Sequence, residues 1–396
     1  MKIRTLKDIP ELDSKRVLLR VDFNVPMNKE GQIQDNARIL GALPTIKFLQ
    51  EKKAKIILIS HMGRPKGQPS DHLKLNPVAA ELESLIAKPV KKLDTILDSA
   101  KEIDGMQPGE IILLENIRFD DGEESCDPEF TKKLASLGEI FVNDAFGTAH
   151  RKHASTAGLA EHLPAYAGLL MEKEITELNA VLHGNPPKPL TMIFGGAKID
   201  TKIGIIKNFL DKADYFLIGG GLANTFLHAA GHNVADSLYQ ADKTGVAQEI
   251  INHINNPESL VIPHDVIVSD QISNDAPTQN VSSHQVPADM KILDIGQQTT
   301  AKFQEIVAKS GTVIWNGPLG LSEFAPFANG TLKVAKTLAE SHATSIIGGG
   351  DTAEAIKRFQ IPEDKFTHIS TGGGACLEFL SGETLPGIEC LVDHTL

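Results

Sequence analysis

The chain has 396 residues, of which 41% are hydrophobic and 23% charged, and a formal net charge of −12. This length allows two or three domains with their own cores, and the negative charge argues against a broad surface for nucleic acid or an acidic membrane. Three cysteines without a CxxC pair argue against a disulfide framework or a zinc site. With neither a signal segment nor an apolar run near the roughly 20 residues that span a bilayer, the sequence favours a cytoplasmic protein.

Short β-branched runs alternate with helical patterns along nearly the whole chain. The expected strands are Arg16–Val21, Lys55–Ile59, Glu110–Leu114, Glu139–Val142, Leu190–Phe194, Tyr215–Ile218, Thr312–Trp315, Ser345–Ile347 and Thr367–Ile369. The expected helices include Ala37–Glu51, Pro77–Ile86, Pro128–Leu137, Thr201–Leu210, Leu332–Glu340 and Thr352–Phe359. This alternation predicts an α/β fold, in which parallel sheets carry helices on both faces.

A domain boundary is expected near the middle of the chain. Leu169–Leu182 has a helical pattern, and residues 183–189 after it contain one glycine and three prolines, which stop a helix. We therefore place one lobe at 1–170, a connecting helix at 171–185 and a second lobe at 186–376. The alternative is a surface helix inside one large domain. The polar stretch Asn274–Asp289 is interpreted as a loop.

The first half places arginines and other polar residues directly after its strands, where parallel α/β sheets bind ligands. These segments are Asp22-Phe23-Asn24, His61-Met62-Gly63-Arg64, Glu115–Phe119 and Asn143–Arg151, and Arg38 opens the next helix. Arg38, Arg64, Arg118 and Arg151 together suggest a ligand with at least two negative groups. Each arginine alone would more often form a surface ion pair, and Arg20, inside a strand, is taken as structural.

The second half repeats a glycine turn between a strand and a helix. The turns are Gly195-Gly196, Gly219–Gly221, Gly348–Gly350 and Gly372–Gly374, and such turns let phosphate approach a helix N-terminus. Lys198 and Lys202 would lie on one helix face, or be two solvated lysines. Asp351 fits an N-cap, a ligand of Mg²⁺ carried by a nucleotide, or both. Glu323 could accept ribose hydroxyls or simply be solvated.

Standard nucleotide motifs are missing. The sequence has no GxxxxGK[ST], no GxGxxG and no HRD…DFG set, which excludes a P-loop protein and a protein kinase and argues against an NAD-dependent oxidoreductase. Three hypotheses therefore remain: a kinase acting on a small acid, a non-catalytic nucleotide sensor on the same fold, and a dehydrogenase. A scaffold protein fits the pattern least.

Nine segments in order from residue 20 to residue 375 resemble the phosphoglycerate kinase family. They are RVDFNVP, SHMGRPKG, LLENIRF, NDAFGTAHRKHAST, FGGAKIDTK, IGGGLANTFL, VIWNGPLG, IGGGDTAEA and STGGGA. The resemblance implies a monomer with two Rossmann-like lobes joined by a helix across a hinged cleft, and a tail, 377–396, returning to the first lobe. It also implies reversible phosphoryl transfer between 1,3-bisphosphoglycerate and ADP, giving 3-phosphoglycerate and ATP, with Mg²⁺ bound as MgATP or MgADP.

The resemblance carries site roles over to matching positions. Those for the glycerate ligand are Asp22, Phe23, Asn24, Arg38, His61, Met62, Gly63, Arg64, Arg118 and Arg151. Those for the nucleotide are Gly196, Lys198, Lys202, Gly220, Asn316, Glu323, Gly349, Gly350, Asp351 and Thr352, with Asp351 also the metal ligand. The transfer itself would use Arg38, Lys198, Gly350 and Gly373. Cys376 stands at a position where the family usually has serine, so only a minor side-chain contact of that position is in doubt.

The chemistry of an acyl phosphate explains the absence of a kinase-type catalytic aspartate. Its leaving group is a carboxylate, a weak base that needs no general acid, so alignment and charge neutralisation remain the protein's tasks. The transfer is then direct and in line. Closure of the lobes would align the ligands and exclude water, with hinges expected at both ends of Leu169–Leu182 and near residues 370–385.

Overall fold

The computed structural model describes residues 2–254 and 256–393. The chain divides into two compact units, one formed by residues 1–176 with 384–396 and the other by residues 177–383. Helix α6 (Leu169–Leu182) contains the point of division, at the position where the sequence predicts a connecting helix. Each unit has a parallel sheet of its own, and the two are described separately below.

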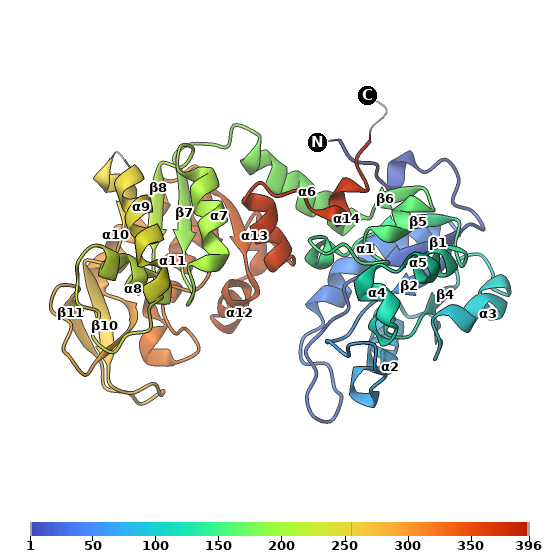
Figure 1. The fold of residues 1–396 in the computed structure, drawn as a ribbon, viewed down its shortest axis with the longest axis horizontal. Helices are drawn as coiled ribbons and strands as arrows, with labels where there is room; N and C mark the ends of the chain where they lie inside the picture. Colours follow the sequence, from blue (N-terminus) through green and yellow to red (C-terminus); the bar gives the residue numbers. More distant parts are fainter. Residues whose placement is uncertain (1, 255, 394–396) are drawn as a thin grey trace. The chain divides into compact units, whose positions relative to one another are not determined.

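Unit 1 is built on a six-stranded parallel sheet with the strand order β3-β4-β2-β1-β5-β6 (Figure 1). Its strands are β1 (Arg16–Arg20), β2 (Lys55–Ile59), β3 (Val90–Lys92), β4 (Ile111–Leu113), β5 (Ile140–Asn143) and β6 (Ala165–Ala167). The central strands β1 and β2 are buried along four of their five residues. Continuous β-branched and leucine runs are the expected sequence for such a doubly covered strand.

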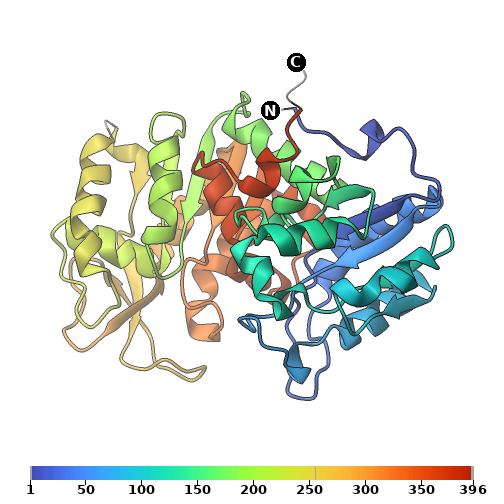
Figure 2. The ribbon, with the colours of Figure 1, turned by 45° about the vertical axis from the view of Figure 1, so that its right-hand side comes forward.

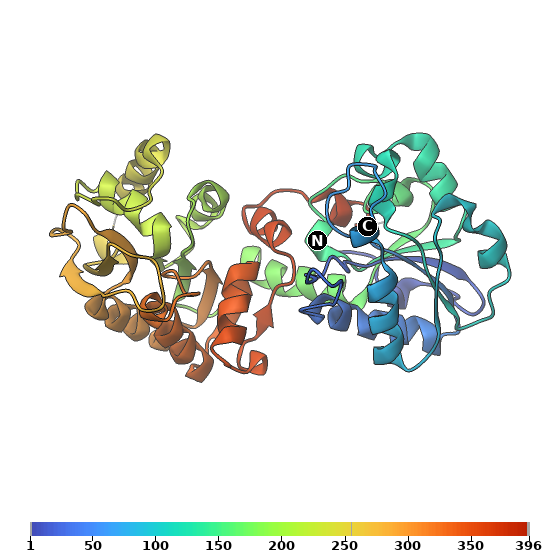
Figure 3. The same cartoon turned by 90° about the horizontal axis from the view of Figure 1, so that it is seen from below.

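Helices lie on both faces of this sheet, as the view in Figure 3 shows. They are α1 (Ala37–Glu51), α2 (Asn76–Ile86), α3 (Ala100–Asp104), α4 (Asp121–Ser125) and α5 (Pro128–Ala135). Helix α1 buries Ile39, Ala42, Ile46 and Leu49, whose spacing of three or four residues makes one apolar stripe. Helix α5 begins where the side chain of Asp127 accepts the Phe130 N–H at 2.8 Å, with proline at the first helical position.

The C-terminal segment belongs to unit 1. Helix α14 (Pro386–Glu389) lies beside the segment after β5, because the Gly387 N–H donates to the Ala149 carbonyl at 2.8 Å. Asn143 Nδ2 in turn donates to the Gly387 carbonyl at 3.2 Å. An antiparallel bridge between Ile3 and Val392 brings the two described ends of the chain together (Figure 2).

Unit 2 has a second six-stranded parallel sheet with the order β15-β14-β13-β7-β8-β9. Its strands are β7 (Leu190–Phe194), β8 (Tyr215–Ile218), β9 (Leu260–Val261), β13 (Thr312–Asn316), β14 (Thr344–Gly348) and β15 (His368–Ile369). The helices are α7 (Asp200–Phe209), α8 (Gly220–Ala229), α9 (Thr244–His253), α10 (Gln297–Lys309), α11 (Asn329–Glu340), α12 (Gly350–Arg358) and α13 (Gly374–Leu380). Trp315 of β13 is fully buried and packs with Phe303 of α10 and Val334 of α11.

A third, antiparallel sheet in unit 2 corrects one sequence-based expectation. Its order is β11-β10-β12, formed by β10 (Asp265–Ser269), β11 (Gln279–Ser282) and β12 (Lys291–Ile295). The stretch Asn274–Asp289 is therefore not only a loop, since it contains β11. Three of the four residues of β11 are exposed, because it lies at the edge of the sheet. A polar edge strand lacks the apolar alternation by which strands are predicted.

Apart from this sheet, the predicted elements are confirmed within about three residues at their ends. The predicted bounds of Lys55–Ile59, Leu190–Phe194, Tyr215–Ile218, Ala37–Glu51 and Leu169–Leu182 agree with the structure. The α/β class with two parallel, helix-covered sheets is likewise confirmed. No helix among the described residues has the length and apolar character to cross a bilayer.

Candidate functional site

The predicted glycerate residues of unit 1 come from four neighbouring strands. β4, β2, β1 and β5 are consecutive in the sheet, and all run parallel. The segments after them therefore meet at one edge of the sheet, as the sequence pattern predicts. Asn24 Oδ1 accepts the Gly63 N–H at 2.9 Å, and Arg118 Nη1 donates to the Gly63 carbonyl at 2.6 Å. These bonds join the segments after β1, β2 and β4.

Asp22 and Arg38 form the most accessible ion pair at this edge. Arg38 Nη1 lies 3.1 and 3.0 Å from the two carboxylate oxygens of Asp22 and donates to the Asn24 carbonyl at 3.0 Å. About 37% of the Arg38 side chain is exposed, so its remaining guanidinium donors can reach a ligand. By contrast, the side chains of Phe23 and Met62 are buried, which leaves their backbone groups as possible ligand contacts.

Arg20 is part of this cluster, although its place inside β1 hides it in the sequence. It is fully buried, and its Nη2 lies 3.2 Å from Nδ1 of His61. Because a guanidinium only donates, Nδ1 of His61 must accept, and the ring proton resides on Nε2. Burial, followed by the charges of Arg20, Arg118, Arg151 and Arg38, lowers the pKa of His61 well below its ordinary value. His61 is thus a neutral ring with an N–H donor at Nε2.

Arg118 is the most unusual of the predicted arginines. It is 2% exposed, and its Nη2 is buried without a hydrogen-bond partner among the described residues. Glu124 forms an ion pair with Nε of Arg118 at 3.0 Å, but the geometry of this contact is not that of a hydrogen bond. Burial lowers the pKa of Arg118 to about 10, so the group is still charged at neutral pH. A buried cation with a free donor is stabilised by an anion placed against it.

Arg151 lies with this group, whereas no contact among the described residues ties Arg64 to it. Nε of Arg151 donates to Nε2 of His150 at 3.1 Å, and Arg151 is among the charges that lower the pKa of His61 and of His153. Arg64 is exposed and forms no hydrogen bond or ion pair with the described residues. Three of the four predicted arginines therefore gather around His61. We call Arg20, His61, Arg38, Arg118 and Arg151 the arginine cluster.

The glycine turns of unit 2 follow β7, β8, β14 and β15, and β14, β13, β7 and β8 are neighbours. The turns after β7 and β13 touch through their backbones. The N–H of Gly195 donates to the Asn316 carbonyl at 2.9 Å, and a Cβ on Gly195 would lie 2.1 Å from the Pro318 carbonyl oxygen. Some glycines therefore permit packing of turn against turn. In these turns, Gly350, Gly373 and Gly374 would instead place a Cβ in open space.

Asn316 and Thr352 hold the turn after β14 in place. Nδ2 of Asn316 donates to the Gly348 carbonyl at 2.8 Å, and Oγ1 of Thr352 accepts the Gly317 N–H at 2.7 Å. Both side chains are buried. Helix α12 begins at Gly350, and its N-cap is Gly349 at φ +93°. The interpretation of Asp351 as the N-cap is therefore wrong: it is the second residue of the helix, exposed at its N-terminal end.

Lys202 and Lys198 differ more than their spacing suggests. Lys202 is 8% exposed and lies in α7, and its Nζ would be 3.5 Å from a Cβ on Gly196. Burial lowers the pKa of Lys202, while the nearby charge of Asp351 opposes the shift. Lys198 precedes α7 and is exposed, so the prediction that both lysines lie on one helix face is wrong.

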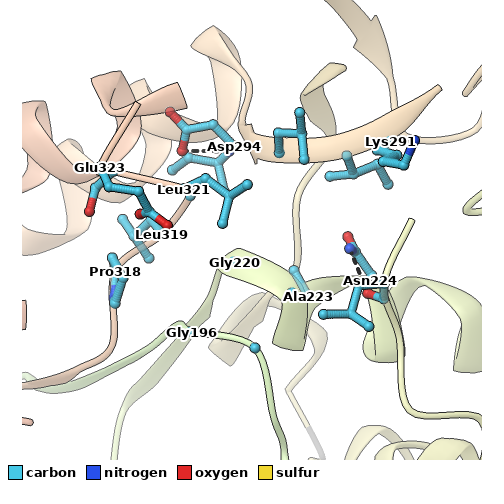
Figure 4. A pocket seen from close by; sticks show the side chains of 18 of the residues that line it. Gly196, Gly220, Ala223, Asn224, Lys291, Asp294, Pro318, Leu319, Leu321 and Glu323 are labelled. Carbon is cyan, nitrogen blue, oxygen red and sulfur yellow. Dashed lines mark hydrogen bonds between the residues drawn. The ribbon is translucent and has the colours of Figure 1, made fainter. Parts of the chain in front are cut away.

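A cavity of about 580 Å³ opens beside these turns. Gly196, Gly220, Glu323 and Asp351 line it together with the apolar residues Leu238, Val266, Ile272, Pro318, Leu319 and Leu321. Figure 4 shows Glu323 on one side of it, with Gly196 and Gly220 along the floor. Leu238 and Ile272 are 68% and 47% exposed, which is unusual for large apolar side chains. An apolar cavity with a few carboxylates suits a nucleobase and its ribose.

Comparison with known proteins decides the family. A family model described as phosphoglycerate kinase matches residues 6–383. The chain belongs to this family. A phosphoglycerate kinase of Dictyoglomus turgidum is 51% identical over 399 aligned positions, covering 99% of this chain and all of that protein. The solved phosphoglycerate kinase of Coxiella burnetii is 41% identical, with a TM-score of 0.89 over 98% of this chain and 99% of its own.

A second solved phosphoglycerate kinase, from Pyrococcus horikoshii, is 33% identical with a TM-score of 0.86 and 98% coverage of each chain. Membership confirms the resemblance seen in the motifs and the prediction of a kinase that transfers a phosphoryl group to a carboxylate. It also gives no support to the dehydrogenase. The residues that carry the reaction are the subject of the proposal that follows.

Proposed function

We propose that unit 1 binds 3-phosphoglycerate or 1,3-bisphosphoglycerate and that unit 2 binds ATP or ADP, with the phosphoryl group passing directly between them. The glycerate ligand is assigned to the arginine cluster with Asp22 and Asn24, and exposed Arg64 is assigned to the same ligand. The nucleotide is assigned to the cavity of unit 2. The chain is proposed to act as a monomer.

The observation that carries the proposal is an unsatisfied hydrogen-bond donor on the buried guanidinium of Arg118. Its Nη2 has no acceptor among the described residues, and burial, followed by the charges of Arg151 and Arg20, lowers its pKa against the opposing charge of Glu124. An anionic ligand would supply an acceptor for Nη2 and further negative charge together. Neutral His61 then donates from Nε2 to a carboxylate or phosphate oxygen. A ligand with two anionic ends satisfies more of this cluster than one with a single charge.

The nucleotide assignment rests on the shape of the cavity and on the N-terminus of α12. The apolar side chains suit the base, Glu323 suits the ribose hydroxyls, and the open approach to Gly350 leaves room for phosphate at the helix N-terminus. Lys202 lies buried against Gly196, where its ammonium is poorly solvated, so a phosphate oxygen placed beside it would stabilise its charge. Lys198, exposed before α7, can move to the transferring group.

The residues present fit a nucleotide-borne Mg²⁺. Among the described residues, no group of three or more His, Cys, Asp or Glu side chains forms a metal cage. Mg²⁺ usually binds one or two carboxylates and otherwise water and phosphate, and Asp351 supplies one exposed carboxylate at the cavity. When bound, the ion would neutralise phosphate charge. Arg38, Lys198 and the backbone at Gly350 and Gly373 would neutralise the rest during transfer.

The chemistry needs orientation rather than proton transfer, since the acceptor is an ionised carboxylate. Preorganised donors of this kind are typically worth about 3–4 kcal/mol each at a transition state. One ligand is assigned to each unit, so the reaction requires the two bound ligands to be brought into line. Closure with hinges around Leu169–Leu182 and residues 370–385 stays a prediction, which solution scattering with and without both ligands tests.

A coupled assay of ADP formation from ATP and 3-phosphoglycerate tests the proposal against a non-catalytic nucleotide sensor. We expect turnover that depends on both substrates and on Mg²⁺. Nucleotide binding without any transfer, at saturating 3-phosphoglycerate, would establish the sensor instead. Turnover that is unchanged by EDTA would remove Mg²⁺ from the proposal.

A further inference from the structure

We propose that Glu123 and Ser155 are positioning residues, which hold Arg20 so that His61 presents its Nε2–H to the glycerate ligand. This inference rests on the proposed function of the arginine cluster. Neither residue belongs to the predicted site, and neither touches the accessible part of the cluster. They act on the ligand through Arg20 and His61.

The contacts form an unbroken buried chain. Oε1 of Glu123 accepts the Ser155 hydroxyl at 2.7 Å, and Oε2 accepts the Ser155 N–H at 2.9 Å. Because the hydroxyl hydrogen of Ser155 is committed to Glu123, its oxygen is free to accept, and Nε of Arg20 donates to it at 2.8 Å. All three residues are fully buried. With Glu123 ionised, the direction of every bond in the chain is fixed.

Each nitrogen of the Arg20 guanidinium then has one partner. Nε is bound to Ser155, Nη1 donates to the Val21 carbonyl, and Nη2 faces Nδ1 of His61. A planar guanidinium held at three points cannot rotate away from the imidazole. Loss of the Ser155 oxygen would release one of these points. The guanidinium would then be free to tilt, and Nη2, the donor that keeps the His61 proton on Nε2, would no longer be fixed against Nδ1.

Glu123 also determines the charge and shape of this region. Among the nearby charges, that of Glu123 most strongly opposes the fall in the pKa of Arg20 that burial causes. Its backbone carbonyl accepts the Ala154 N–H at 3.0 Å, so the same residue fixes both Ala154 and Ser155. Arg151 lies a few residues earlier in that segment. A neutral residue at position 123 would leave Arg20 without its buried counter-charge.

A purely structural role predicts different behaviour. If the chain only stabilised the fold, its loss would lower stability without a specific effect on the glycerate ligand or on the His61 ring. Positioning predicts a change in the tautomer of His61 and a selective loss of affinity for 3-phosphoglycerate. Both can be measured in the full chain.

The test uses Ser155→Ala and Glu123→Gln, with Ser99→Ala as the matched control. Ser99 is also a fully buried serine of unit 1, but its hydroxyl bonds only within its own turn, to Thr95. Nitrogen-15 NMR of the imidazole in the ligand-free protein reports the tautomer, independently of activity. Steady-state kinetics report the KM values for 3-phosphoglycerate and ATP.

We expect wild type and Ser99→Ala to show His61 protonated on Nε2 only, and Ser155→Ala to show a mixture of tautomers. The KM for 3-phosphoglycerate should rise about tenfold in Ser155→Ala and at least as much in Glu123→Gln, with the KM for ATP within twofold of wild type. If Glu123→Gln fails to fold, Ser155→Ala decides. An unchanged His61 tautomer in Ser155→Ala, or a KM for 3-phosphoglycerate that moves no more than in Ser99→Ala, would overturn the proposal. A wild-type chain without transfer activity would instead refute the proposed function, and the tautomer measurement would still stand.

Discussion

Replacement of Gly349 by alanine should disturb the nucleotide site by a mechanism that its neighbour Gly350 does not share. Gly349 is the N-cap of α12, at φ +93° and ψ 133°, a region that side-chain-bearing residues rarely adopt. An added Cβ would also lie 2.7 Å from Nδ2 of Asn316. Gly350 follows directly, lies inside the helix, and would place a Cβ in open space.

The cost of Gly349→Ala has two parts. Backbone strain in a glycine-only region is worth about 1–3 kcal/mol. Displacement of Asn316 would break its 2.8 Å bond to the Gly348 carbonyl, which adds about 1–2 kcal/mol for a buried donor. The sum is roughly 2–5 kcal/mol. For a unit of about this size, that corresponds to a fall in Tm of roughly 4–20 °C. Gly350→Ala should change the free energy of unfolding by less than about 1 kcal/mol.

Calorimetric unfolding and titration with ATP separate the two variants. Gly349→Ala should lower the Tm of unit 2 and weaken ATP binding, because the N-terminus of α12 moves with the turn. Gly350→Ala should keep its Tm and still weaken ATP binding, because its methyl group occupies the space assigned to phosphate. If Gly349→Ala lowers the Tm by less than about 4 °C, the strain argument is refuted. Undiminished ATP binding by Gly350→Ala would refute the phosphate assignment.

Three further predictions concern other parts of the two sites. Arg38→Ala should lower kcat more than tenfold while the Tm changes by only a few degrees. If the variant keeps over a tenth of wild-type turnover, Arg38 has no part in the transfer step. Lys202→Met should leave the free energy of unfolding unchanged or raise it, since burial of the charge is unfavourable. It should also weaken ATP binding about tenfold. Unchanged ATP affinity would argue against contact between Lys202 and a phosphate. Burial raises the pKa of Asp294, which lines the cavity, to about 7, so its carboxyl ¹³C signal should titrate near pH 7. Because the folded state then binds this proton more tightly than the unfolded state, Asp294 should lower the free energy of unfolding as the pH rises from about 4 to 7. A midpoint of the Asp294 ¹³C titration below pH 5 would contradict this.

The sequence predicts the parallel sheets well because their strands are short continuous apolar runs. Lys55–Ile59 and Leu190–Phe194 are such runs, each followed by a turn, and the structure gives them the same bounds. Within the antiparallel sheet, the edge strand Gln279–Ser282 is not predicted because it is polar and exposed. Its pairing with β10 is a tertiary property that no local pattern reports.

Some side-chain contacts of the site likewise could not be predicted from the sequence, because they depend on which strands lie side by side. Arg118 and Arg151 follow strands and could be predicted to gather, but Arg20 lies within a strand, where an arginine is ordinarily structural. Its contact with His61 depends on the adjacency of β1 and β2. Likewise, glycines such as Gly195 that pack against another backbone look the same in sequence as glycines open to a ligand. Only the position of Pro318 beside Gly195 distinguishes them.

A crystal structure of the full chain with 3-phosphoglycerate tests the central claim most directly. The account predicts that an anionic oxygen of the ligand accepts hydrogen bonds from Nη2 of Arg118 and from Nε2 of His61, with Arg38 and Arg151 in contact with the ligand. A ligand bound elsewhere, with Nη2 of Arg118 still lacking an acceptor, would contradict it.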